Sequence, residues 1–545
     1  MKEIKKIMWN ALLLGSVVLA ASVDAKSSKG VGQGKSLGTV NWTTSCSKAV
    51  QEQLDHGLAL LHHMTYRAAR SDFEEVSQKD PKCAMAYWGK SMTYIHPLWS
   101  DPPSVEDFKK GQELSETAAA IPGLTAKEKV MISALQNYWM KGRTQSERPN
   151  LEAFAKGWVQ ALKKFPEDPE IRSFTALAIL ATADPSDKSY KVPKQSATIA
   201  EPVLARIPDH PGAHHYLIHA HDLPGLANNA LGVARNYGRI APSVPHALHM
   251  PTHIFTRLGM WDESIDMNSR SAKAALQQPA GNAISLHYLH ALDYMVYAYL
   301  QQGEVGQAKE VATTMAGLEA PLQTHLASGY TLAAIPARIA LEQQNWAQAA
   351  QLPVADPERF QWQKFPAMVA ITRFSRTLGA ARSGQITFAE SELELMQPLV
   401  TAATEKSAYW GLQAKIMEKT ALAWVLFSKG ERTAALKEMQ LAAALEASTD
   451  KHAVTPGEIL PSQELLGDMQ IALSDPKGAY KSYTAVLRRS PGRLNSLYGA
   501  GRAAELQGQH MLARQHYREL VDMVSPDSTS KRIEHARQAV REEKV

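Results

Sequence analysis

The sequence predicts an all-α protein built from repeated helical hairpins, and two observations carry this prediction. Ala, Leu, Gln and Glu dominate the composition, whereas runs of β-branched residues bounded by turns are scarce. A pattern of small residues, an aromatic residue and a proline recurs with a period of about 34 residues. The 545 residues are 45% hydrophobic and 21% charged, which excludes wholesale disorder and a small disulfide scaffold.

The strongest copies of the repeat lie near the two ends of the chain. They read Gly57-x11-Ala69-x3-Phe73-x7-Pro81, Gly467-x11-Ala479-x3-Tyr483-x7-Pro491 and Gly501-x11-Ala513-x3-Tyr517. Small residues let two antiparallel helices approach closely, the aromatic ring fills the space between them, and the proline ends the second helix. Weaker copies of the repeat are centred on the following residues: Gly259–Trp261, Gly303–Ala308, Trp346–Ala349, Gly384–Ala389 and Gly430–Ala435.

These motifs resemble the tetratricopeptide-repeat superfamily across nearly all of the chain after its first residues. The resemblance implies a right-handed superhelical solenoid in which the first helix of each hairpin lines a concave groove. It also implies that the groove binds a peptide or a protein segment. Three phrases, Cys83–Gly89, His246–Gly259 and His290–Leu300, are similar to an exported bacterial subset of this superfamily. The resemblance supplies an architecture and no reaction.

The order of these features divides the chain into six expected parts. They are a signal peptide (1–25), a flexible lead-in (26–40), N-terminal repeats (41–199), His-rich repeats (200–310), degenerate repeats (311–450) and C-terminal repeats with a charged tail (451–545). Two stretches that contain proline, Asp184–Thr198 and His452–Pro461, interrupt the helical pattern and are expected to be loops.

The first 25 residues have the layout of a signal peptide. Three lysines precede an apolar run from Ala11 to Ala21, and Ala25 then offers a small-residue cleavage site before Lys26. A membrane anchor is the alternative, but the apolar run is shorter than the roughly 20 residues that a spanning helix needs. We therefore expect a periplasmic or secreted protein without stable membrane insertion.

Export to an oxidising compartment bears on the state of the only two cysteines. Cys46 and Cys83 form an even pair in an oxidising compartment, which favours one disulfide over two separate buried thiols. The net charge of +5 is spread over the chain without a basic stripe, so the sequence predicts no nucleic-acid partner.

Histidine is concentrated in the middle of the chain, where ten of the nineteen lie between His210 and His290. His215 and His219 are four residues apart, and so are His249 and His253, which puts each pair on one face of a helix. The two pairs are offset by one repeat length. Equivalent residues of successive repeats lie side by side, so the four rings are expected to form one patch on the groove wall. By contrast, His62 and His63 are expected to be solvated near a turn.

Neutral imidazoles at this spacing can converge on one transition-metal ion, with zinc and copper as the first choices. The expected ligands are His215, His219, His249, His253, His290 and Asp293. The alternative is that these histidines pack, form hydrogen bonds or bind an anionic peptide. Further residues are expected to line the groove, although a buried position is the alternative for the tryptophan: Tyr216, Asp222, His246, Arg257, Tyr297 and Trp88.

Two classes of function fit these features. The first is an exported scaffold that binds a peptide in its groove and carries a His-rich metal site on the groove wall. The second is a metal-dependent hydrolase or oxidoreductase that uses the same histidines. Its acid/base groups would come from Asp222, Asp293, Tyr216 or Tyr297. No HExxH phrase supports a peptidase, and no catalytic residue is assigned.

Overall fold

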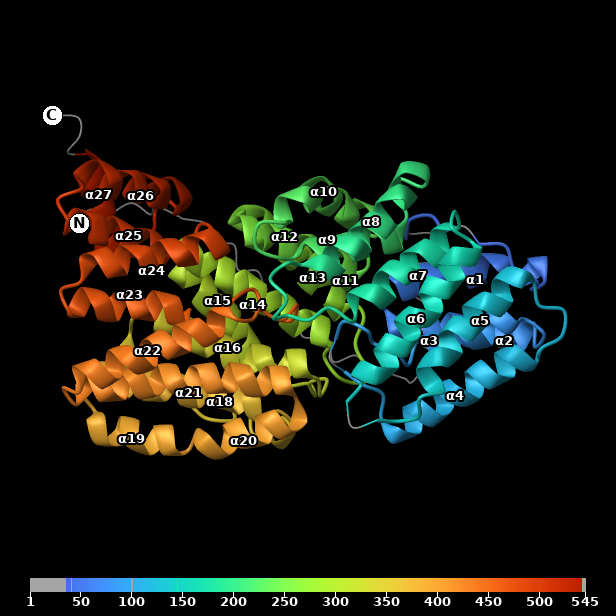
Figure 1. Ribbon diagram of the computed structural model, residues 1–545, viewed down its shortest axis with the longest axis horizontal. Helices are drawn as coiled ribbons and strands as arrows, with labels where there is room; N and C mark the ends of the chain where they lie inside the picture. Colours follow the sequence, from blue (N-terminus) through green and yellow to red (C-terminus); the bar gives the residue numbers. More distant parts are fainter. Residues whose placement is uncertain (1–35, 41, 100, 145, 542–545) are drawn as a thin grey trace, which may run out of the picture.

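The computed structural model describes residues 36–40, 42–99, 101–144 and 146–541, and they form an elongated array of helical hairpins (Figure 1). This confirms the predicted all-α class. Within the described ranges, β structure is limited to two isolated bridges, Ala280 with Ala283 and Ile284 with Leu322. The expected signal peptide lies outside the described residues, as do 26–35 of the lead-in.

The helices follow one another along the chain with short connections. The first part holds α1 (Gln51–His62), α2 (Tyr66–Lys79), α3 (Ala84–Met92), α4 (Val105–Ala120), α5 (Ala126–Trp139), α6 (Arg148–Lys164), α7 (Pro169–Leu180) and α8 (Lys191–Arg206). The middle holds α9 (Pro211–His221), α10 (Leu231–Ile240), α11 (Pro245–His249), α12 (Pro251–Leu258), α13 (Trp261–Leu276), α14 (Leu286–Gln301), α15 (Val305–Ala316), α16 (Leu326–Glu342) and α17 (Trp346–Ala350).

The last part completes the array and contains the longest helix. It holds α18 (Pro366–Arg382), α19 (Ile386–Glu394), α20 (Gln397–Lys406), α21 (Ala408–Ser428), α22 (Arg432–Ala447), α23 (Ser462–Ala472), α24 (Pro476–Arg489), α25 (Leu494–Glu505), α26 (His510–Met523) and α27 (Lys531–Arg541). In the described part of the chain, three short 3₁₀ helices join these elements: η1 (Lys48–Val50), η2 (Ala227–Ala230) and η3 (Trp362–Lys364).

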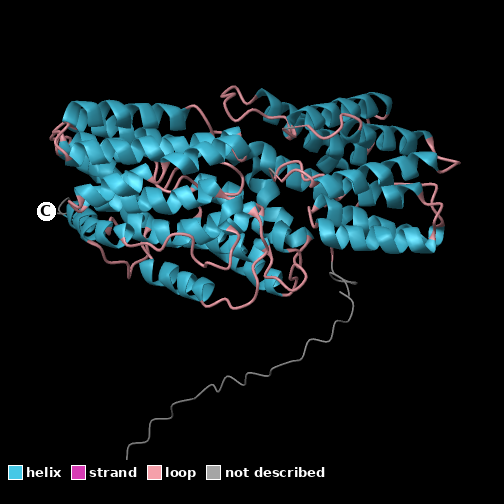
Figure 2. Cartoon of the chain, turned by 90° about the horizontal axis from the view of Figure 1, so that it is seen from below, coloured by secondary structure: helices cyan, strands magenta, loops and turns pink. Residues whose placement is uncertain are grey.

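Neighbouring helices pack as stacked hairpins. Most helices contact the next one along the chain, and several also contact a helix of the following hairpin, as α14 contacts α16 and α16 contacts α18. Figure 2 shows the resulting side-by-side arrangement, with the connecting loops gathered at the helix ends. None of the helices in the described part combines the length and the apolar character required to span a bilayer.

The aromatic residues of the strong repeats fill the spaces that glycines leave, as the spacing predicts. The ring of Phe73 lies so close to Gly57 and Gly89 that added Cβ atoms would sit 3.1 and 2.6 Å from it. Tyr483 occupies the same position against Gly467, where the distance would be 2.8 Å. A side chain at these glycines would force the paired helices apart, so the small residues set the spacing between the helices.

The stretch Asp184–Thr198, expected to be a loop, is partly helical. Helix α8 begins at Lys191, and Pro193 occupies its first turn. A proline is tolerated there because the first backbone N–H groups of a helix have no partner within the helix. The other expected loop is confirmed, since no helix is assigned between the end of α22 at Ala447 and the start of α23 at Ser462.

The C-terminal repeats fold back onto the middle of the chain, which differs from an array in which each repeat touches only its neighbours. Buried Arg493, just before α25, forms ion pairs of 2.9 Å with Glu342 at the end of α16 and 2.8 Å with Glu464 of α23. The indole of Trp261 donates to the backbone oxygen of Gly492 at 3.2 Å, and Ser525 N–H donates to Gln302 O at 3.0 Å.

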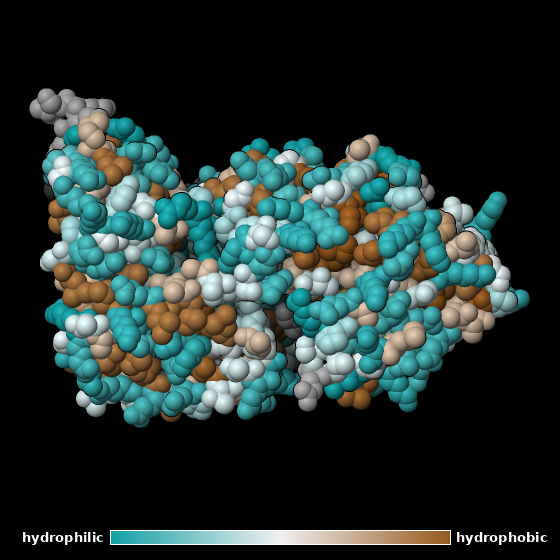
Figure 3. All heavy atoms as spheres, in the orientation of Figure 1, coloured by the Kyte–Doolittle hydropathy of each residue, from teal (hydrophilic) through white to brown (hydrophobic). Residues whose placement is uncertain are grey.

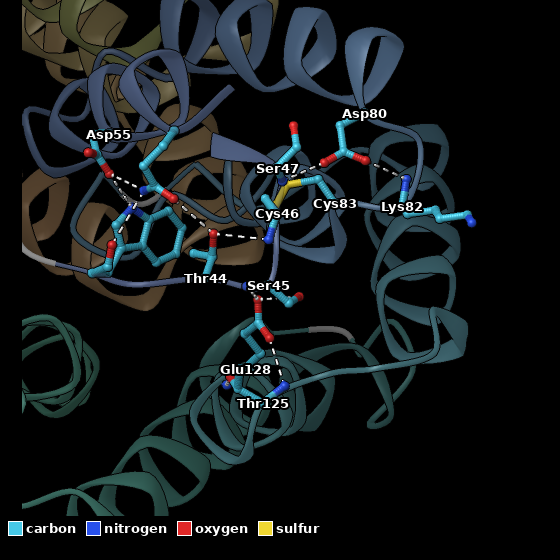
Figure 4. The surroundings of a disulfide bond; sticks show 12 residues. Thr44, Ser45, Cys46, Ser47, Asp55, Asp80, Lys82, Cys83, Thr125 and Glu128 are labelled. Carbon is cyan, nitrogen blue, oxygen red and sulfur yellow. Dashed lines mark hydrogen bonds between the residues drawn. A yellow bond between two sulfur atoms is a disulfide. The ribbon is translucent and has the colours of Figure 1, made fainter. Parts of the chain in front are cut away.

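The predicted disulfide is present, and it secures the N-terminal end of the array (Figure 4). The Cα atoms of Cys46 and Cys83 lie 4.5 Å apart, within the range that a disulfide requires. On either side, the N–H of Ser45 donates to Glu128 at 2.8 Å and that of Ser47 to Asp80 at 2.8 Å. The bond and these hydrogen bonds join the segment before α1 to α3 and α5.

The described residues of the lead-in, 36–40, dock onto the helices, whereas the lead-in was expected to be flexible. Leu37 is buried, and its carbonyl lies 3.0 Å from Nε2 of His63. Thr39 bonds to Asp209 through its backbone N–H and through its hydroxyl. The lead-in therefore covers the end of α1, and this is one reason why His63 is buried and not solvated.

Candidate metal centre

The histidines of the middle repeats meet where three successive layers of helix come together. His215 and His219 lie on α9, His249 ends α11, His253 lies on α12, and His290 lies on α14. Each of α9, α11 and α12 begins with a proline, whose fixed φ suits the first position of a helix. Every one of these rings is in contact with another histidine ring.

Three buried residues, His249, His253 and His290, form what we call the His249 set. Each offers one ring nitrogen, and these three atoms lie within 4.8 Å of one another. The Nε2 atoms of His249 and His253 are 3.0 Å apart. The rings of His249 and His290 are closer still, with centroids separated by 4.2 Å. This is a group of three imidazoles with the spacing of ligands to a common ion.

The hydrogen bonds of the His249 set determine which ring nitrogens carry hydrogen. Nδ1 of His249 lies 2.7 Å from Oδ1 of Asn268, whose amide nitrogen donates to Ser264 O, so the histidine must donate. Nδ1 of His253 lies 2.8 Å from a carboxylate oxygen of Asp222, an acceptor only. In the neutral rings each Nε2 atom therefore carries a lone pair, and the two lone pairs face each other.

The surroundings keep these rings neutral. Burial lowers the pKa of His249 and of His290 well below the usual range, and the neighbouring histidines lower both further. Burial also lowers the pKa of His253, although Asp222 opposes the shift. A neutral imidazole with a free lone pair is the form that binds a metal ion. Nδ1 of His290 is buried without a hydrogen-bond partner.

A second group, which we call the His215 set, lies beside the first. It consists of His215, His219 and His246, again with one ring nitrogen each within 4.8 Å. The structure therefore brings together the five predicted histidines but distributes them over two groups of three. His246, expected to line the groove, belongs to the second group. Its distance from His249 and His253 along the chain, three and seven residues, is a helical spacing that would have identified it.

Asp293, an expected ligand, is in neither of these two groups. Its Oδ1 accepts from Nε of Arg338 at 3.2 Å, and both side chains are buried. Burial raises the pKa of Asp293 to about 6, against the opposing effect of Arg338. The guanidinium of Arg338 on α16 therefore binds one oxygen of this carboxylate, while Oδ2 is buried without a hydrogen-bond partner.

Asp222 lies beside His253 and accepts hydrogen bonds from three side chains. It accepts from His253, from Nε of Arg257 at 2.8 Å and from Nζ of Lys451 at 2.9 Å. Burial lowers the pKa of Lys451 to about 8, although Asp222 opposes this shift. Asp222 and Arg257, both expected in the groove, therefore bind each other. Through its bond to Nδ1 of His253, Asp222 orients that histidine ring.

Lys451 belongs to a stretch, residues 450–461, that we call the inner segment and that lies against α14 and α16. The hydroxyl of Tyr294 donates to Ala453 O at 3.1 Å and to Thr455 O at 3.0 Å. Arg338 donates to Glu458 O at 2.6 Å and to Gly457 O at 2.8 Å. The concave wall, expected to be open to a partner peptide, is thus covered here by the chain itself.

Three other residues expected in the groove are also buried. Trp88 lies in the hydrophobic core, where its indole donates to Met131 O at 3.3 Å. The hydroxyl of Tyr216 lies 2.9 Å from Nδ1 of His62, and Arg493 donates to the hydroxyl of Tyr297 at 3.4 Å. Trp88 therefore follows the core alternative, because rings of the neighbouring helices enclose it.

A buried group on the other side of α9 resembles a metal site in composition. His62, Glu170 and His210, the Glu170 set, also bring three ligand atoms within 4.8 Å of one another. His62 Nε2 and His210 Nε2 lie 2.8 and 3.2 Å from the two oxygens of Glu170. His62 was expected to be solvated, but α1 packs directly on α9 and encloses it.

The surface is hollowed between the two halves of the molecule (Figure 3). A pocket of about 360 Å³ there is lined by residues that include Asp101, His325, Lys364 and Trp410. The ring of Trp99 contacts both His325 of the pocket lining and His246 of the His215 set, with centroids 5.6 and 5.1 Å away.

Comparison with known proteins identifies the repeat. The tetratricopeptide repeat family matches residues 465–528, which span α23 to α26. Among solved structures, yeast Tom70 is similar with 13% identity over 91% of this chain and 97% of that one, with a TM-score of 0.27. Cut9 in the APC/C Cut9–Hcn1 hetero-tetramer is similar with 11% identity over 91% and 96%, with a TM-score of 0.26. No curated protein matches the sequence.

Proposed function

We propose that this tetratricopeptide-repeat protein binds a transition-metal ion, zinc or copper, at the His249 set. One observation carries the proposal: two buried Nε2 lone pairs face each other at 3.0 Å, while both Nδ1 atoms donate to fixed acceptors. Two lone pairs at that distance repel each other unless a cation lies between them. An ion about 2.0–2.1 Å from two imidazoles holds the nitrogens roughly 3 Å apart, and His290 supplies a third ligand.

A proton shared by the two rings is the competing explanation, and the charges around the site oppose it. Protonation would place a third cation beside Asp222, which already accepts from Arg257 and Lys451. Metal–nitrogen bonds compensate for a buried positive charge more strongly than one N–H···N hydrogen bond does. Asn268 and Asp222 orient the two rings as hydrogen-bonded neighbours of metal ligands usually do.

The groups expected to provide acid/base catalysis have other partners. Tyr216 bonds to His62, Asp293 to Arg338 and Asp222 to two cations. Three histidines leave one coordination position open, which is the arrangement of catalytic zinc sites. The proposal is therefore a metal-binding centre with one coordination position open to a small ligand.

The test is the metal content of the full chain, purified without chelator, loaded with zinc or copper and dialysed. We expect His249→Ala to lose the ion held by the His249 set while keeping its helical circular dichroism. His510→Ala provides a matched control because His510 is an exposed histidine at the start of α26. Wild-type protein that retains no ion after dialysis contradicts the proposal.

A second candidate function is peptide binding, and the hydrogen bonds that hold the inner segment favour it. Tyr294, Tyr330 and Arg338 bind backbone carbonyls of that segment, a feature that any extended peptide offers. We propose that a partner segment occupies this wall when the inner segment leaves it. A labelled peptide of residues 450–461 should bind a variant whose own segment is replaced by a Gly/Ser linker.

Arg338→Met in that linker variant should weaken binding of the peptide, because two carbonyl contacts are lost. Arg235→Met is the control, since Arg235 lies on the exposed surface with its side chain 54% accessible. Equal binding by the two substituted proteins would exclude this candidate.

We also propose that the protein is exported to the periplasm or secreted. The layout of residues 1–25 and the disulfide both support an oxidising compartment. The first residue of the mature protein, determined by N-terminal sequencing from the native host, should be Lys26. A chain that retains Met1 would contradict cleavage.

A further inference from the structure

We infer that the protein holds a second metal ion at the His215 set, so that the two groups of histidines form a two-ion centre. This inference rests on the proposed function, because it places the second ion beside the one at the His249 set. It adds His246 to the ligands and assigns a class of exogenous ligand, a small oxygen donor such as hydroxide that bridges two ions.

The hydrogen bonds of the His215 set pair only some of its ring nitrogens. Nδ1 of His215 lies 2.7 Å from the carbonyl oxygen of His62, so it donates and leaves Nε2 as a lone pair. That lone pair lies 3.1 Å from Nε2 of His246. His215 is fully buried and His246 is 3% exposed, so water does not compensate either ring.

Without metal, this group leaves two polar atoms unsatisfied. His246 can donate from Nε2 to His215, but Nδ1 of His246 is then a buried nitrogen without a partner. Nε2 of His219 is also buried and has no partner. Unpaired buried polar atoms are rare and costly, and two in one group of three rings point to a missing partner. An ion takes up the lone pairs of His215 and His219 directly.

The two sets are close enough to act together. The ring of His219 lies 5.7 Å from that of His253, and the ring of His246 lies 6.3 Å from that of His249, measured between centroids. This proximity follows from the sequence, because the His215/His219 pair and the His249/His253 pair are one repeat apart on adjacent helices. With three protein ligands each, the ions have open positions, and two-metal sites use such positions to share an oxygen ligand.

The experiment counts ions in the full chain loaded with copper(II) or zinc and dialysed. We expect two ions per chain in the wild type and in His510→Ala, and one in His246→Ala and in His290→Ala. His219→Gln serves as a second variant of the same set if His246→Ala fails to fold, because its ring is only half-buried. Thermal unfolding and circular dichroism check that each variant is folded.

The outcomes separate the two claims. One ion in the wild type, unchanged in His246→Ala, overturns the second site and leaves the proposed function standing. No ion overturns the proposed function itself. Two ions that persist in both His246→Ala and His219→Gln show binding elsewhere and also overturn the inference.

Electron paramagnetic resonance of the copper(II) form tests the bridge. Two coupled copper ions should give a signal that integrates to clearly less than two spins per chain, and His246→Ala should restore a one-spin signal. A full two-spin signal in the wild type would overturn the shared ligand.

Discussion

The His249 set and the Glu170 set are both buried and each brings three ligand atoms within 4.8 Å of one another, but their hydrogen bonds differ. In the Glu170 set, one carboxylate accepts from both rings. The remaining nitrogens are also paired, because Tyr216 lies 2.9 Å from Nδ1 of His62 and Ala213 N–H donates to Nδ1 of His210. This group is complete without an ion. In the His249 set, the Nδ1 atoms of His249 and His253 donate to Asn268 and Asp222. Their Nε2 atoms, which carry lone pairs, face each other at 3.0 Å.

The comparison teaches that clustering of ligand residues is a weak indicator of a metal site. A stronger indicator is which ring nitrogens carry a hydrogen, because this shows whether every nitrogen of the group has a hydrogen-bond partner without a metal ion. The predictions below test this difference, beginning with the condition that acts on all buried histidines.

Acid should destabilise the protein by several kcal/mol, and His63 provides the test case. Burial lowers the pKa of His63 to about 3, from 6.5 in the unfolded chain. Between these values the unfolded state binds a proton that the folded state does not. The stability is therefore complete above pH 6.5 and falls by about 1.4 kcal/mol per pH unit below it. Urea unfolding at pH 7, 6, 5 and 4 measures the slope.

His63→Gln removes one titrating group and should flatten that slope by about the same amount per pH unit. His215, with a pKa lowered to about 3 by burial, contributes with the same sign in the metal-free protein. An unchanged slope in His63→Gln would mean that His63 is not held neutral in the folded protein.

His62→Ala should lower the free energy of unfolding by about 3–5 kcal/mol, because it leaves the buried carboxylate of Glu170 with one partner fewer. Metal bound per folded chain should stay the same, since the Glu170 set is complete without an ion. Denaturant unfolding and metal analysis of the same preparation give both values. Loss of metal without loss of stability would reverse the assignment of the two sets.

Reduction of the disulfide should cost about 3–4 kcal/mol, since Cys46 and Cys83 close a loop with a sequence separation of 37 residues. The expected change is a lower unfolding midpoint in reducing buffer and in Cys46→Ser/Cys83→Ser. The metal content of the folded protein should not change, because both cysteines lie outside the three groups. A change in metal content would link this end of the array to the site.

Asn268→Leu should weaken metal binding by about 10–100-fold while removing no ligand. The amide oxygen of Asn268 holds Nδ1 of His249 as the donor, and leucine frees the ring to adopt the other tautomer. Competition with a metal indicator measures the affinity. Gln302→Leu is a control, since Gln302 also bonds as an amide but to Asp262. An unaltered affinity would show that the tautomer of His249 is not fixed from outside.

The sequence predicts local packing well and long-range contacts poorly. Phe73 and Tyr483 occupy the spaces left by glycines because both partners belong to one repeat or to adjacent ones. Cys46 and Cys83 pair for the same reason. The position of Asp293 depends on Arg338 on another helix, and that of Lys451 depends on a segment that crosses from the C-terminal half. Spacing along a single helix carries no information about such partners.

The sequence brought five of the six clustered histidines together, but it did not indicate His246 as the sixth or the division into two groups. The offset of one repeat brought four histidines together as expected. Which ring nitrogens face one another depends on ring rotation, and the acceptors His62 O and Asn268 Oδ1 fix that rotation for His215 and His249. Both acceptors come from helices other than the one that carries the histidine they bind.

The return of the C-terminal repeats onto α16 changes how the array can come apart. In an open array of repeats, stability is a sum of terms between neighbours, and the ends can fray one hairpin at a time. Here Arg493 joins Glu342 to Glu464, so the two ends of the stretch from α16 to α25 are held together. The inner segment belongs to this stretch, and its Lys451 bonds to Asp222 beside the histidines. Fraying from the C-terminal end must first break this junction, and the chain unfolds as a more cooperative unit whose ordering includes contacts distant in sequence.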